Sequence, residues 1–223
     1  EFKVKILEHD FSGMQLRIDG KETWVALVGD FNASNMLAVY ACTQILGENA
    51  DQSLSALSAV EPVSGRFNVV SGGHPIRAIV DYAHTPDALH HVLETINKIR
   101  TGNEMLITVF GCGGDRDKAK RPLMGRIAST LSDKVIFTSD NPRNEDPEKI
   151  IEQIESGVPA EHFKKYISIS SRLQAIKTAC QLAHKGDIIL VAGKGHETYQ
   201  DIKGERLDFD DAKELKQHLQ NKS

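Results

Sequence analysis

From Arg66 onward, short apolar runs alternate with longer stretches whose apolar residues recur at helical spacing, and this alternation constrains the fold more than any other feature of the chain. Repeated strand and helix units build a parallel sheet, because a parallel connection needs a crossover that is usually a helix. We therefore expect an α/β fold with a Rossmann-like, mostly parallel sheet and helices on both faces. The expected strands are residues 67–70, 76–80, 105–110, 134–138, 166–169 and 188–192, and the expected helices begin at Pro86 and Pro147 or cover 122–131, 172–184 and 208–219.

Two of these helices have a clear start signal. Thr85 and Asp146 each precede a proline. Thr and Asp side chains cap the free N–H groups of a first helical turn, and proline is favoured at the first helical position. Between the first two strands, Gly72 and Gly73 indicate a hairpin.

The first part of the chain has a different pattern. Strands are expected at 2–6, 14–18 and 24–28, followed by helices at 32–46 and 53–60. One face of the longer helix collects apolar residues, namely Met36, Leu37, Tyr40, Ala41 and Ile45. Pro62 and the turn-forming pair Ser64-Gly65 mark a boundary, so the expected domains are residues 1–61 and 62–223.

Charge and composition exclude several classes of partner. The net charge is −4, whereas a nucleic-acid-binding chain normally carries a basic footprint. The three cysteines are odd in number and widely spaced, so neither a disulfide framework nor a structural zinc site is expected. The chain has no apolar run of membrane-spanning length and no signal sequence, so we expect a cytoplasmic protein without membrane insertion. Because the chain opens on Glu1 rather than Met, we interpret it as a piece of a longer protein.

Polar residues follow four of the expected strands, in the segments 81–85, 111–116, 140–143 and 193–197. The carboxyl ends of parallel strands meet at one edge of a sheet, which is where open α/β sheets bind ligands. Each segment alone is more simply explained as a helix cap or a turn. Four of them on one edge favour a binding site.

Other kinds of site fit the sequence less well. The dinucleotide fingerprint G-x-G-x-x-G fails at its third glycine, which is Arg116 in one segment and Thr198 in another, so a nucleotide-dependent oxidoreductase is a distant alternative. His90 and His91 are expected on a solvated helix face, and we expect no metal site. Cys112 has no neighbouring histidine in the sequence to activate it. The phosphate-binding pattern G-x-x-x-x-G-K-[ST] is absent, so a complete ATP-driven enzyme is not expected.

The run Asp140-Asn141-Pro142-Arg143 resembles the diaminopimelate-reading motif of the Mur ligases, which build the peptidoglycan stem peptide. Residues 81–89, 111–125 and 191–200 resemble their counterparts in the members of that family that add the third stem-peptide residue, and residues 29–35 resemble the end of the family's central ATPase domain. The resemblance covers nearly the whole chain. It implies that residues 1–61 are a remnant of the central ATP-binding domain, that residues 62–223 are the C-terminal, amino-acid-binding domain, and that the N-terminal domain and the rest of the central domain are missing partners.

The resemblance also implies a nucleotide site. In it, Asn32 and Asn35 contact adenine, Arg66 reaches an ATP phosphate, Asp81 accepts from ribose hydroxyls and His84 lies close to the nucleotide. A guanidinium suits phosphate because it offers paired, charge-assisted hydrogen bonds, whereas the two asparagines are explained equally well as helix caps. The family's phosphate loop and magnesium ligands lie upstream, so ATP and Mg²⁺ are expected cofactors of the parent enzyme and the chain alone is expected to be inactive.

The amino acid implied by the resemblance is meso-2,6-diaminopimelate, whose second zwitterionic centre must be recognised. Arg116 and Arg143 would bind its carboxylate. The expected acceptors for its ammonium group are Asp140, the amide oxygen of Asn141, the carbonyl of Gly193, and Glu197, with Pro142 pre-shaping the loop. Family members that add lysine lack the arginine of the Asp140-Asn141-Pro142-Arg143 motif. The presence of Arg143 therefore favours diaminopimelate as the substrate.

The implied activity is an ATP-dependent amide-forming ligation that adds meso-diaminopimelate to UDP-MurNAc-L-Ala-D-Glu through an acyl phosphate. A free-standing amino-acid-binding or regulatory module with the same sheet is the main alternative, because the chain lacks the phosphate-binding loop.

Overall fold

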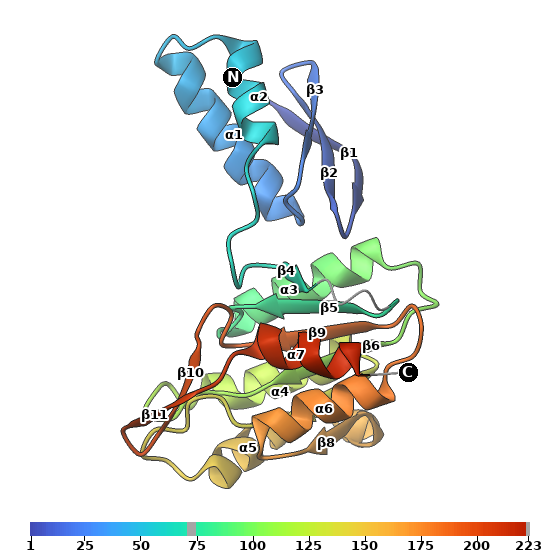
Figure 1. The fold of residues 1–223 in the computed structure, drawn as a ribbon, viewed down its shortest axis with the longest axis vertical. Helices are drawn as coiled ribbons and strands as arrows, with labels where there is room; N and C mark the ends of the chain where they lie inside the picture. Colours follow the sequence, from blue (N-terminus) through green and yellow to red (C-terminus); the bar gives the residue numbers. More distant parts are fainter. Residues whose placement is uncertain (71–74, 222–223) are drawn as a thin grey trace. The chain divides into compact units, whose positions relative to one another are not determined.

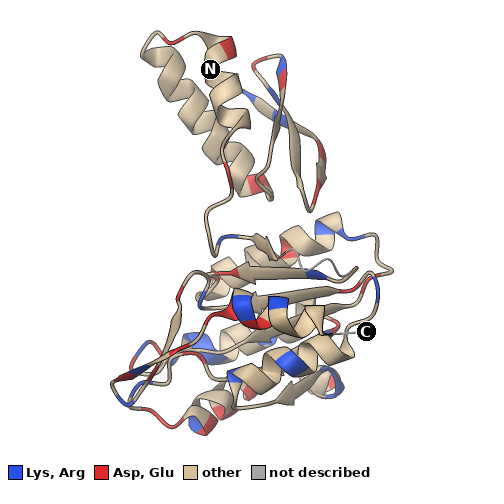
Figure 2. Ribbon diagram, in the orientation of Figure 1, with Lys and Arg blue, Asp and Glu red and all other residues tan. Residues whose placement is uncertain are grey.

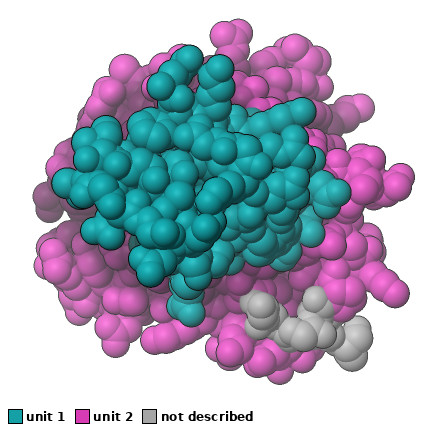
Figure 3. Space-filling view, turned by 90° about the horizontal axis from the view of Figure 1, so that it is seen from above, with its two compact units in different colours: residues 1–63 teal, residues 64–223 magenta. Residues whose placement is uncertain are grey.

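The computed structural model describes residues 1–70 and 75–221, which form two compact units. The N-terminal unit is Glu1–Val63 and the C-terminal unit is Ser64–Ser223, and Figure 3 colours them separately. The boundary expected from the sequence lies after residue 61. Acidic and basic residues are interspersed along the ribbons of both units (Figure 2).

The N-terminal unit packs two helices on a small antiparallel sheet. Strands β1 (Val4–Asp10), β2 (Gly13–Ile18) and β3 (Lys21–Val25) pair in sequence order, and helices α1 (Asp30–Ile45) and α2 (Ala50–Ser58) follow. The core joins strand residues such as Leu16 with Met36 and Tyr40 of α1. The expected apolar face of this helix is confirmed at those two positions, but it does not extend to Ile45, which is 77% exposed at the end of the helix.

The C-terminal unit is built on a six-stranded sheet in the order β4-β5-β9-β6-β7-β8 (Figure 1). Its strands are β4 (Asn68–Val70), β5 (Arg77–Asp81), β6 (Leu106–Phe110), β7 (Lys134–Phe137), β8 (Tyr166–Ser168) and β9 (Ile188–Ala192). Only β4 pairs antiparallel, with β5, and the other neighbours pair parallel. Every residue of β6 and β9 is buried, as their apolar composition requires of central strands covered on both faces. The expected α/β fold is confirmed.

Helices cover both faces of this sheet. Helices α6 (Arg172–Leu182) and α7 (Asp211–Gln220) lie on one face, while α3 (Pro86–Ile99), α4 (Lys120–Leu131) and α5 (Pro147–Glu155) lie on the other (Figure 1). Both expected caps are confirmed: Thr85 Oγ1 accepts from Ala88 N at 3.3 Å, and Asp146 Oδ1 accepts from Glu148 N at 3.0 Å. Within the described residues, no helix has the length and apolar character needed to cross a membrane.

The structure corrects the sequence-based prediction after β9. A two-stranded antiparallel hairpin, β10 (Tyr199–Ile202) and β11 (Glu205–Asp208), occupies a stretch for which no strand was expected, and α7 begins at Asp211 rather than at residue 208. A short 3₁₀ helix at Ala160–Lys165 was also not expected. No residue of β10 or β11 is buried, so the pair lacks the apolar alternation that identifies a strand in sequence. The expected Gly72-Gly73 turn lies outside the described residues, although its flanking strands pair as a hairpin would.

Candidate ligand-binding site at the carboxyl edge of the sheet

The four polar segments follow β5, β6, β7 and β9, which are neighbours in the sheet. They line one cavity of about 730 Å³ together with residues of the loop before α4 and of β10. The prediction that these segments share one edge is therefore confirmed. Among the residues expected to bind the amino acid, all except Pro142 line the cavity, namely Arg116, Asp140, Asn141, Arg143, Gly193 and Glu197.

Pro142 instead supports the loop. It is buried, and its carbonyl accepts a hydrogen bond from Glu145 N at 3.0 Å. A Cβ at Gly114 would lie 1.9 Å from the same carbonyl oxygen, so the loops after β6 and β7 approach too closely for any side chain at that glycine.

A buried lysine that sequence analysis did not select bonds to Asn141 and Glu197, two residues that line the cavity. Lys194 is 0% exposed. Its Nζ donates to Asn141 Oδ1 at 3.0 Å and to Glu197 Oε2 at 3.2 Å. Asn141 Nδ2 in turn donates to Glu197 Oε2 at 2.8 Å, so the three side chains form a closed network.

This network changes the role expected for Asn141. Its Oδ1 accepts from Lys194 Nζ and also from Asp201 N at 2.9 Å, so both of its lone pairs are engaged. The sequence suggested that this oxygen would meet the ammonium group of a ligand. In the structure, the acceptor left for a ligand in this network is Glu197, whose side chain is 20% exposed.

Asp140 is also buried, with 8% of its surface exposed. Burial raises the pKa of its carboxyl group, while Arg172 and Lys194 oppose that rise. A Cβ at Gly193 would lie 2.6 Å from Asp140 Oδ2, and Gly193 has a φ of 114°. Only glycine suits that position, because a side chain there would be strained and would displace the carboxylate.

Two arginines line the cavity nearer to solvent. Arg143 has a φ of 50°, and its backbone is held by bonds to the β10–β11 hairpin, from Arg143 N to Asp201 O at 3.0 Å and from Lys203 N to Arg143 O at 2.8 Å. Its Nη1 donates to Gly114 O at 2.8 Å. Arg116 is exposed, and its only hydrogen bond within the described residues is a 3.4 Å contact with the carbonyl of Asp115. Both guanidinium groups therefore keep donors available for an anion.

Two ion pairs hold the loops from behind. Arg121, which is 0% exposed, donates from Nη1 and Nη2 to the two oxygens of Glu145, each at 2.9 Å, and from Nη2 to Gly113 O at 3.1 Å. Hydrogen bonding to Arg121 lowers the pKa of Glu145 to about 2. Glu145 also accepts from Asp115 N at 2.6 Å, so it ties the loop after β7 to the loop after β6.

The second pair is fully buried. Arg172 donates from Nε and Nη2 to the two oxygens of Asp211, both at 2.7 Å. It also donates to the carbonyls of Ala192 at 3.1 Å and Ser139 at 3.4 Å. These carbonyls directly precede Gly193 and Asp140, so the pair fixes the bases of two site segments.

An aromatic cluster borders the cavity near the residues expected to contact a nucleotide. Arg66 lies over the ring of Tyr82, with 5.0 Å between Cζ and the ring centroid, and the rings of His84 and His196 lie 4.6 Å and 5.4 Å from that of Tyr82. Gly65 packs closely here, because a Cβ on it would lie 2.2 Å from His196 N. His84 lines the cavity, as does Tyr82.

Asp81 connects this region to two neighbouring segments through hydrogen bonds. Its Oδ2 accepts from Phe67 N at 2.7 Å, and its backbone carbonyl accepts from Gly193 N at 3.1 Å. Burial raises the pKa of the Asp81 carboxyl group, against the opposing effect of the hydrogen bond from Phe67.

Asn32 and Asn35 belong to the N-terminal unit. Gly29 occupies the N-cap position of α1 and no side chain caps it, so neither asparagine is the cap that the alternative explanation required. Asn32 Nδ2 donates to Val28 O at 2.8 Å, and Asn35 Nδ2 donates to Asn32 Oδ1 at 3.3 Å.

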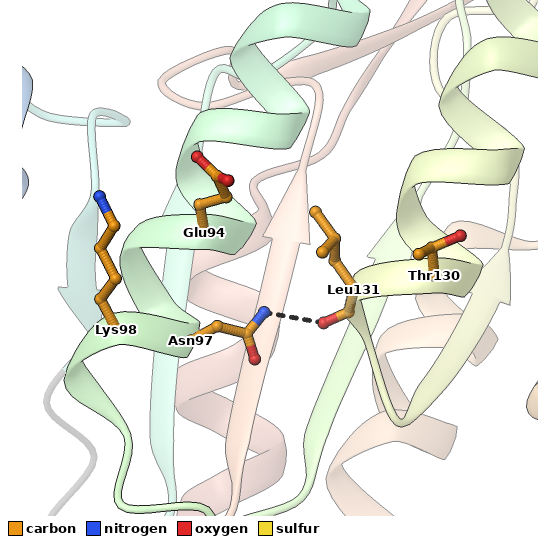
Figure 4. Close-up of a pocket in the computed structure, with 5 residues that line it drawn as sticks. All are labelled: Glu94, Asn97, Lys98, Thr130 and Leu131. Atoms are coloured by element: carbon orange, nitrogen blue, oxygen red, sulfur yellow. Dashed lines mark hydrogen bonds between the residues drawn. The ribbon is translucent and has the colours of Figure 1, made fainter.

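Three other features lie outside this cavity or contribute no ligand-facing group to it. On α3, the potential metal-ligand atoms of His90, His91 and Glu94 lie within 4.8 Å of one another. A smaller hollow of about 340 Å³ lies between α3 and α4, where Asn97 Nδ2 donates to Leu131 O at 2.9 Å (Figure 4). Burial raises the pKa of Cys112 to about 12, so its thiol is not an activated nucleophile.

Comparison with known proteins matches residues 65–195 to the family described as "Mur ligase, glutamate ligase domain". Proteins named UDP-N-acetylmuramoyl-L-alanyl-D-glutamate--2,6-diaminopimelate ligase from Cytophaga hutchinsonii and Bacteroides thetaiotaomicron are each 51% identical, over 98% and 97% of this chain and 45% of their own length. A solved structure of a ligase with the same name is 37% identical, with a TM-score of 0.70 over 98% of this chain and 45% of that one. Folylpolyglutamate synthase from Thermotoga maritima shares the fold, with a TM-score of 0.66 at 20% identity over 86% of this chain and 43% of its own. The chain thus spans less than half the length of these relatives, and it belongs to the Mur ligase family.

Proposed function

We propose that this chain is the C-terminal part of an ATP-dependent ligase that joins an amine of meso-diaminopimelate to the D-glutamate carboxylate of UDP-MurNAc-L-Ala-D-Glu in peptidoglycan synthesis. The observation that carries the proposal is that two arginines, Arg116 and Arg143, and the carboxylate of Glu197 line the same cavity. The names of the relatives support the same reaction. In such a bacterial pathway, the expected location of the protein is the cytoplasm.

The chemistry of the cavity suits one end of diaminopimelate. That end is a zwitterion, so it needs a cation for its carboxylate and an acceptor for its ammonium group. Arg143 offers a planar guanidinium that can form paired hydrogen bonds with a carboxylate, and Arg116 adds a second positive charge. Glu197 is the acceptor, and Gly193 and Asp140 also line the cavity. Lysine has no second carboxylate, so the arginines favour diaminopimelate.

The residues present fit part of a nucleotide site. Arg66 and the rings of Tyr82 and His84 offer a guanidinium and stacking surfaces, which suit a phosphate and a base or ribose. Asp81 is an acceptor for ribose hydroxyls in the proposal, and Asn32 and Asn35 are contacts for adenine. In the parent enzyme ATP supplies the activation of the glutamate carboxylate as an acyl phosphate, and Mg²⁺ belongs to the upstream segment together with the phosphate loop.

The contribution of this chain to the reaction is positioning. Holding one zwitterionic centre of diaminopimelate in the cavity leaves the amine at the other end free to reach the activated carboxylate. Such positioning converts an encounter between two solutes into a step within one complex, which is worth several kcal/mol of barrier. The N-terminal unit is then the end of the central ATP-binding domain, and the missing upstream domains are the partners that complete the enzyme.

Calorimetric titration of the 223-residue chain tests the amino-acid site directly. We expect meso-diaminopimelate to bind and L-lysine to bind more weakly or not at all. Binding of NAD in preference to both would favour an oxidoreductase instead. If the parent protein with its upstream segment binds diaminopimelate but makes no tripeptide from ATP and the muramoyl dipeptide, the chain is a binding or regulatory module.

A further inference from the structure

Lys194 belongs to the hydrogen-bond network with Asn141 and Glu197. Its positive charge cannot bind the ammonium group of a substrate directly, so it needs another explanation. Lys194 lies two residues after the end of β9 and is 0% exposed. A buried ammonium group is costly unless it is paired and hydrogen-bonded. Here Nζ has two oxygen partners, Asn141 Oδ1 at 3.0 Å and Glu197 Oε2 at 3.2 Å, and it lies 5.4 Å from the centroid of the Tyr199 ring.

An ammonium group only donates hydrogen bonds, and this fact fixes the orientation of its neighbours. Asn141 must turn its oxygen toward Lys194, so its Nδ2 faces Glu197 Oε2 and donates to it at 2.8 Å. The backbone N–H of Asp201 requires the same orientation, because it also donates to Asn141 Oδ1. A flipped amide would oppose both donors.

Glu197 is consequently held by one oxygen and free at the other. Its Oε2 receives hydrogen bonds from Lys194 and from Asn141. Within the described residues, Oε1 has no hydrogen-bond partner, and the side chain lines the cavity. Oε1 is thus the acceptor that remains for a ligand.

We propose that Lys194 is a positioning residue that orients Asn141 and Glu197 so that Glu197 Oε1 is presented to the ammonium group of the amino-acid substrate. This inference rests on the proposed function for the identity of that substrate. Asn141 acts through Glu197 and does not bind the ammonium group itself.

The β10–β11 hairpin completes the arrangement. The ring of Tyr199 is close to two cations, with Lys194 Nζ at 5.4 Å and Arg206 Cζ at 4.4 Å from its centroid. From the next residue of the hairpin, Gln200 Nε2 donates to Asp140 O at 2.7 Å. The hairpin therefore contacts Lys194 through Tyr199 and the Asp140–Asn141 segment through Gln200 and Asp201. Because the sequence-based prediction lacked this hairpin, it could not include these contacts.

The test compares meso-diaminopimelate binding by the unmodified chain, Lys194→Met and Lys177→Met. Methionine keeps the length of the lysine side chain and removes its charge and donors, and Lys177 is an exposed lysine on α6 that serves as the matched control. We expect Lys194→Met to raise the Kd for diaminopimelate about tenfold or more, which corresponds to the loss of at least one charge-assisted hydrogen bond. Lys177→Met should leave the Kd unchanged. Equal Kd values for Lys194→Met and the unmodified chain would overturn the inference.

A double-mutant cycle separates positioning from a general loss of structure. In a Glu197→Gln background the acceptor is already impaired, so adding Lys194→Met should change the Kd by less than about threefold. Independent, multiplying effects would contradict the proposal. If Lys194→Met does not fold, Asn141→Asp tests the same network. The aspartate keeps an acceptor for Lys194 but turns a carboxylate oxygen instead of an amide donor toward Glu197, so diaminopimelate binding should weaken. Binding as tight as that of the unmodified chain would refute the network.

A ligand-free measurement distinguishes failure of this inference from failure of the proposed function. The side-chain amide of Asn141 should give a resolved NMR signal with slow solvent exchange in the unmodified chain, because Nδ2 donates to Glu197, and fast exchange in Lys194→Met. If the unmodified chain binds no diaminopimelate while this difference is observed, the substrate assignment fails and the orienting role of Lys194 survives. An unchanged amide signal in Lys194→Met would refute that role whatever the ligand.

Discussion

Replacement of Arg143 by alanine should reduce selectivity for diaminopimelate over lysine. Its guanidinium lines the cavity and makes one hydrogen bond within the described residues, to Gly114 O at 2.8 Å, so most of its donors remain for a ligand carboxylate. A hydrogen bond to a charged group contributes about 1.5–3 kcal/mol. Its loss therefore corresponds to a decrease of roughly 10- to 150-fold in kcat/KM for diaminopimelate.

Alanine is a better replacement than glycine for this test. Arg143 has a φ of 50°, and two backbone bonds to the hairpin hold it there. Alanine keeps the same backbone strain as arginine, so the comparison isolates the side chain, whereas glycine would also relax the loop. Arg143→Lys should recover little activity, because a compact ammonium cannot reproduce the planar fork.

The assay is tripeptide formation by the parent protein that includes the upstream segment, with meso-diaminopimelate and with L-lysine as competing substrates. Arg126→Ala is the matched control, since Arg126 is exposed on α4 and does not line the cavity. We expect a large loss for diaminopimelate, a smaller change for lysine and no change in the control. If both substrates lose the same factor, Arg143 holds the Gly114 loop in place and does not select the substrate.

Three further predictions concern completeness and stability. The chain alone should release no phosphate from ATP above background when diaminopimelate and the muramoyl dipeptide are supplied, and turnover would mean that the upstream ligands are not needed. Residues 62–223 expressed alone should unfold cooperatively on heating, because the sheet and its two helical layers form their own core; a molten product would show that residues 1–61 belong to that core. Arg172→Met should lower the free energy of unfolding by about 3–5 kcal/mol, because it leaves Asp211 buried without its partner. Urea unfolding should detect this loss, with Arg126→Met as the control, and a loss below about 1 kcal/mol would contradict the argument.

Acid should weaken the C-terminal unit through Glu145. Hydrogen bonding to Arg121 lowers its pKa from 4.5 to about 2, so the folded state binds this proton less readily than the unfolded state. The stabilisation is therefore present above pH 4.5 and is lost as the pH falls toward 2. Glu145→Gln should unfold more easily at neutral pH and should show a smaller further loss between roughly pH 5 and pH 3, because in that window the carboxylate of the unfolded wild-type chain takes up a proton while the folded one stays ionised. Equal acid sensitivity of the two proteins would refute the assignment.

The parallel sheet was predictable because its signal is local and strong. Strands such as Ile188–Ala192 are apolar throughout, as expected for a strand covered on both faces. Thr85 and Asp146 fixed two helix starts through side-chain bonds that involve only the next three residues. The convergence of the polar segments then followed from topology, since parallel strands end at the same edge.

The missed features depend on contacts between residues far apart in the chain. Arg172 and Asp211 are 39 positions apart, and Lys194 and Asn141 are 53 apart, so no spacing rule connects them. The sequence placed Lys194 in a glycine-rich turn, where a lysine is normally solvated, and gave no sign that the hairpin would cover it. Asn141 was correctly expected at the cavity, but the bonds that occupy its oxygen come from Lys194 and the hairpin, which the prediction lacked.

These distant contacts answer a physical demand that the fold itself creates. At the carboxyl edge the strands stop pairing while the chain is still buried, so carbonyls such as those of Ser139, Ala192 and Gly113 need donors from elsewhere. An arginine can serve several of them at once, and Arg172 and Arg121 each bond to such carbonyls and to a carboxylate. A neutral side-chain amide has two N–H donors and no charge, so it could not serve two carbonyls and also neutralise a buried carboxylate. The buried cations therefore fix the bases of the loops, and the side chains of Arg143 and Glu197 farther along these loops line the cavity.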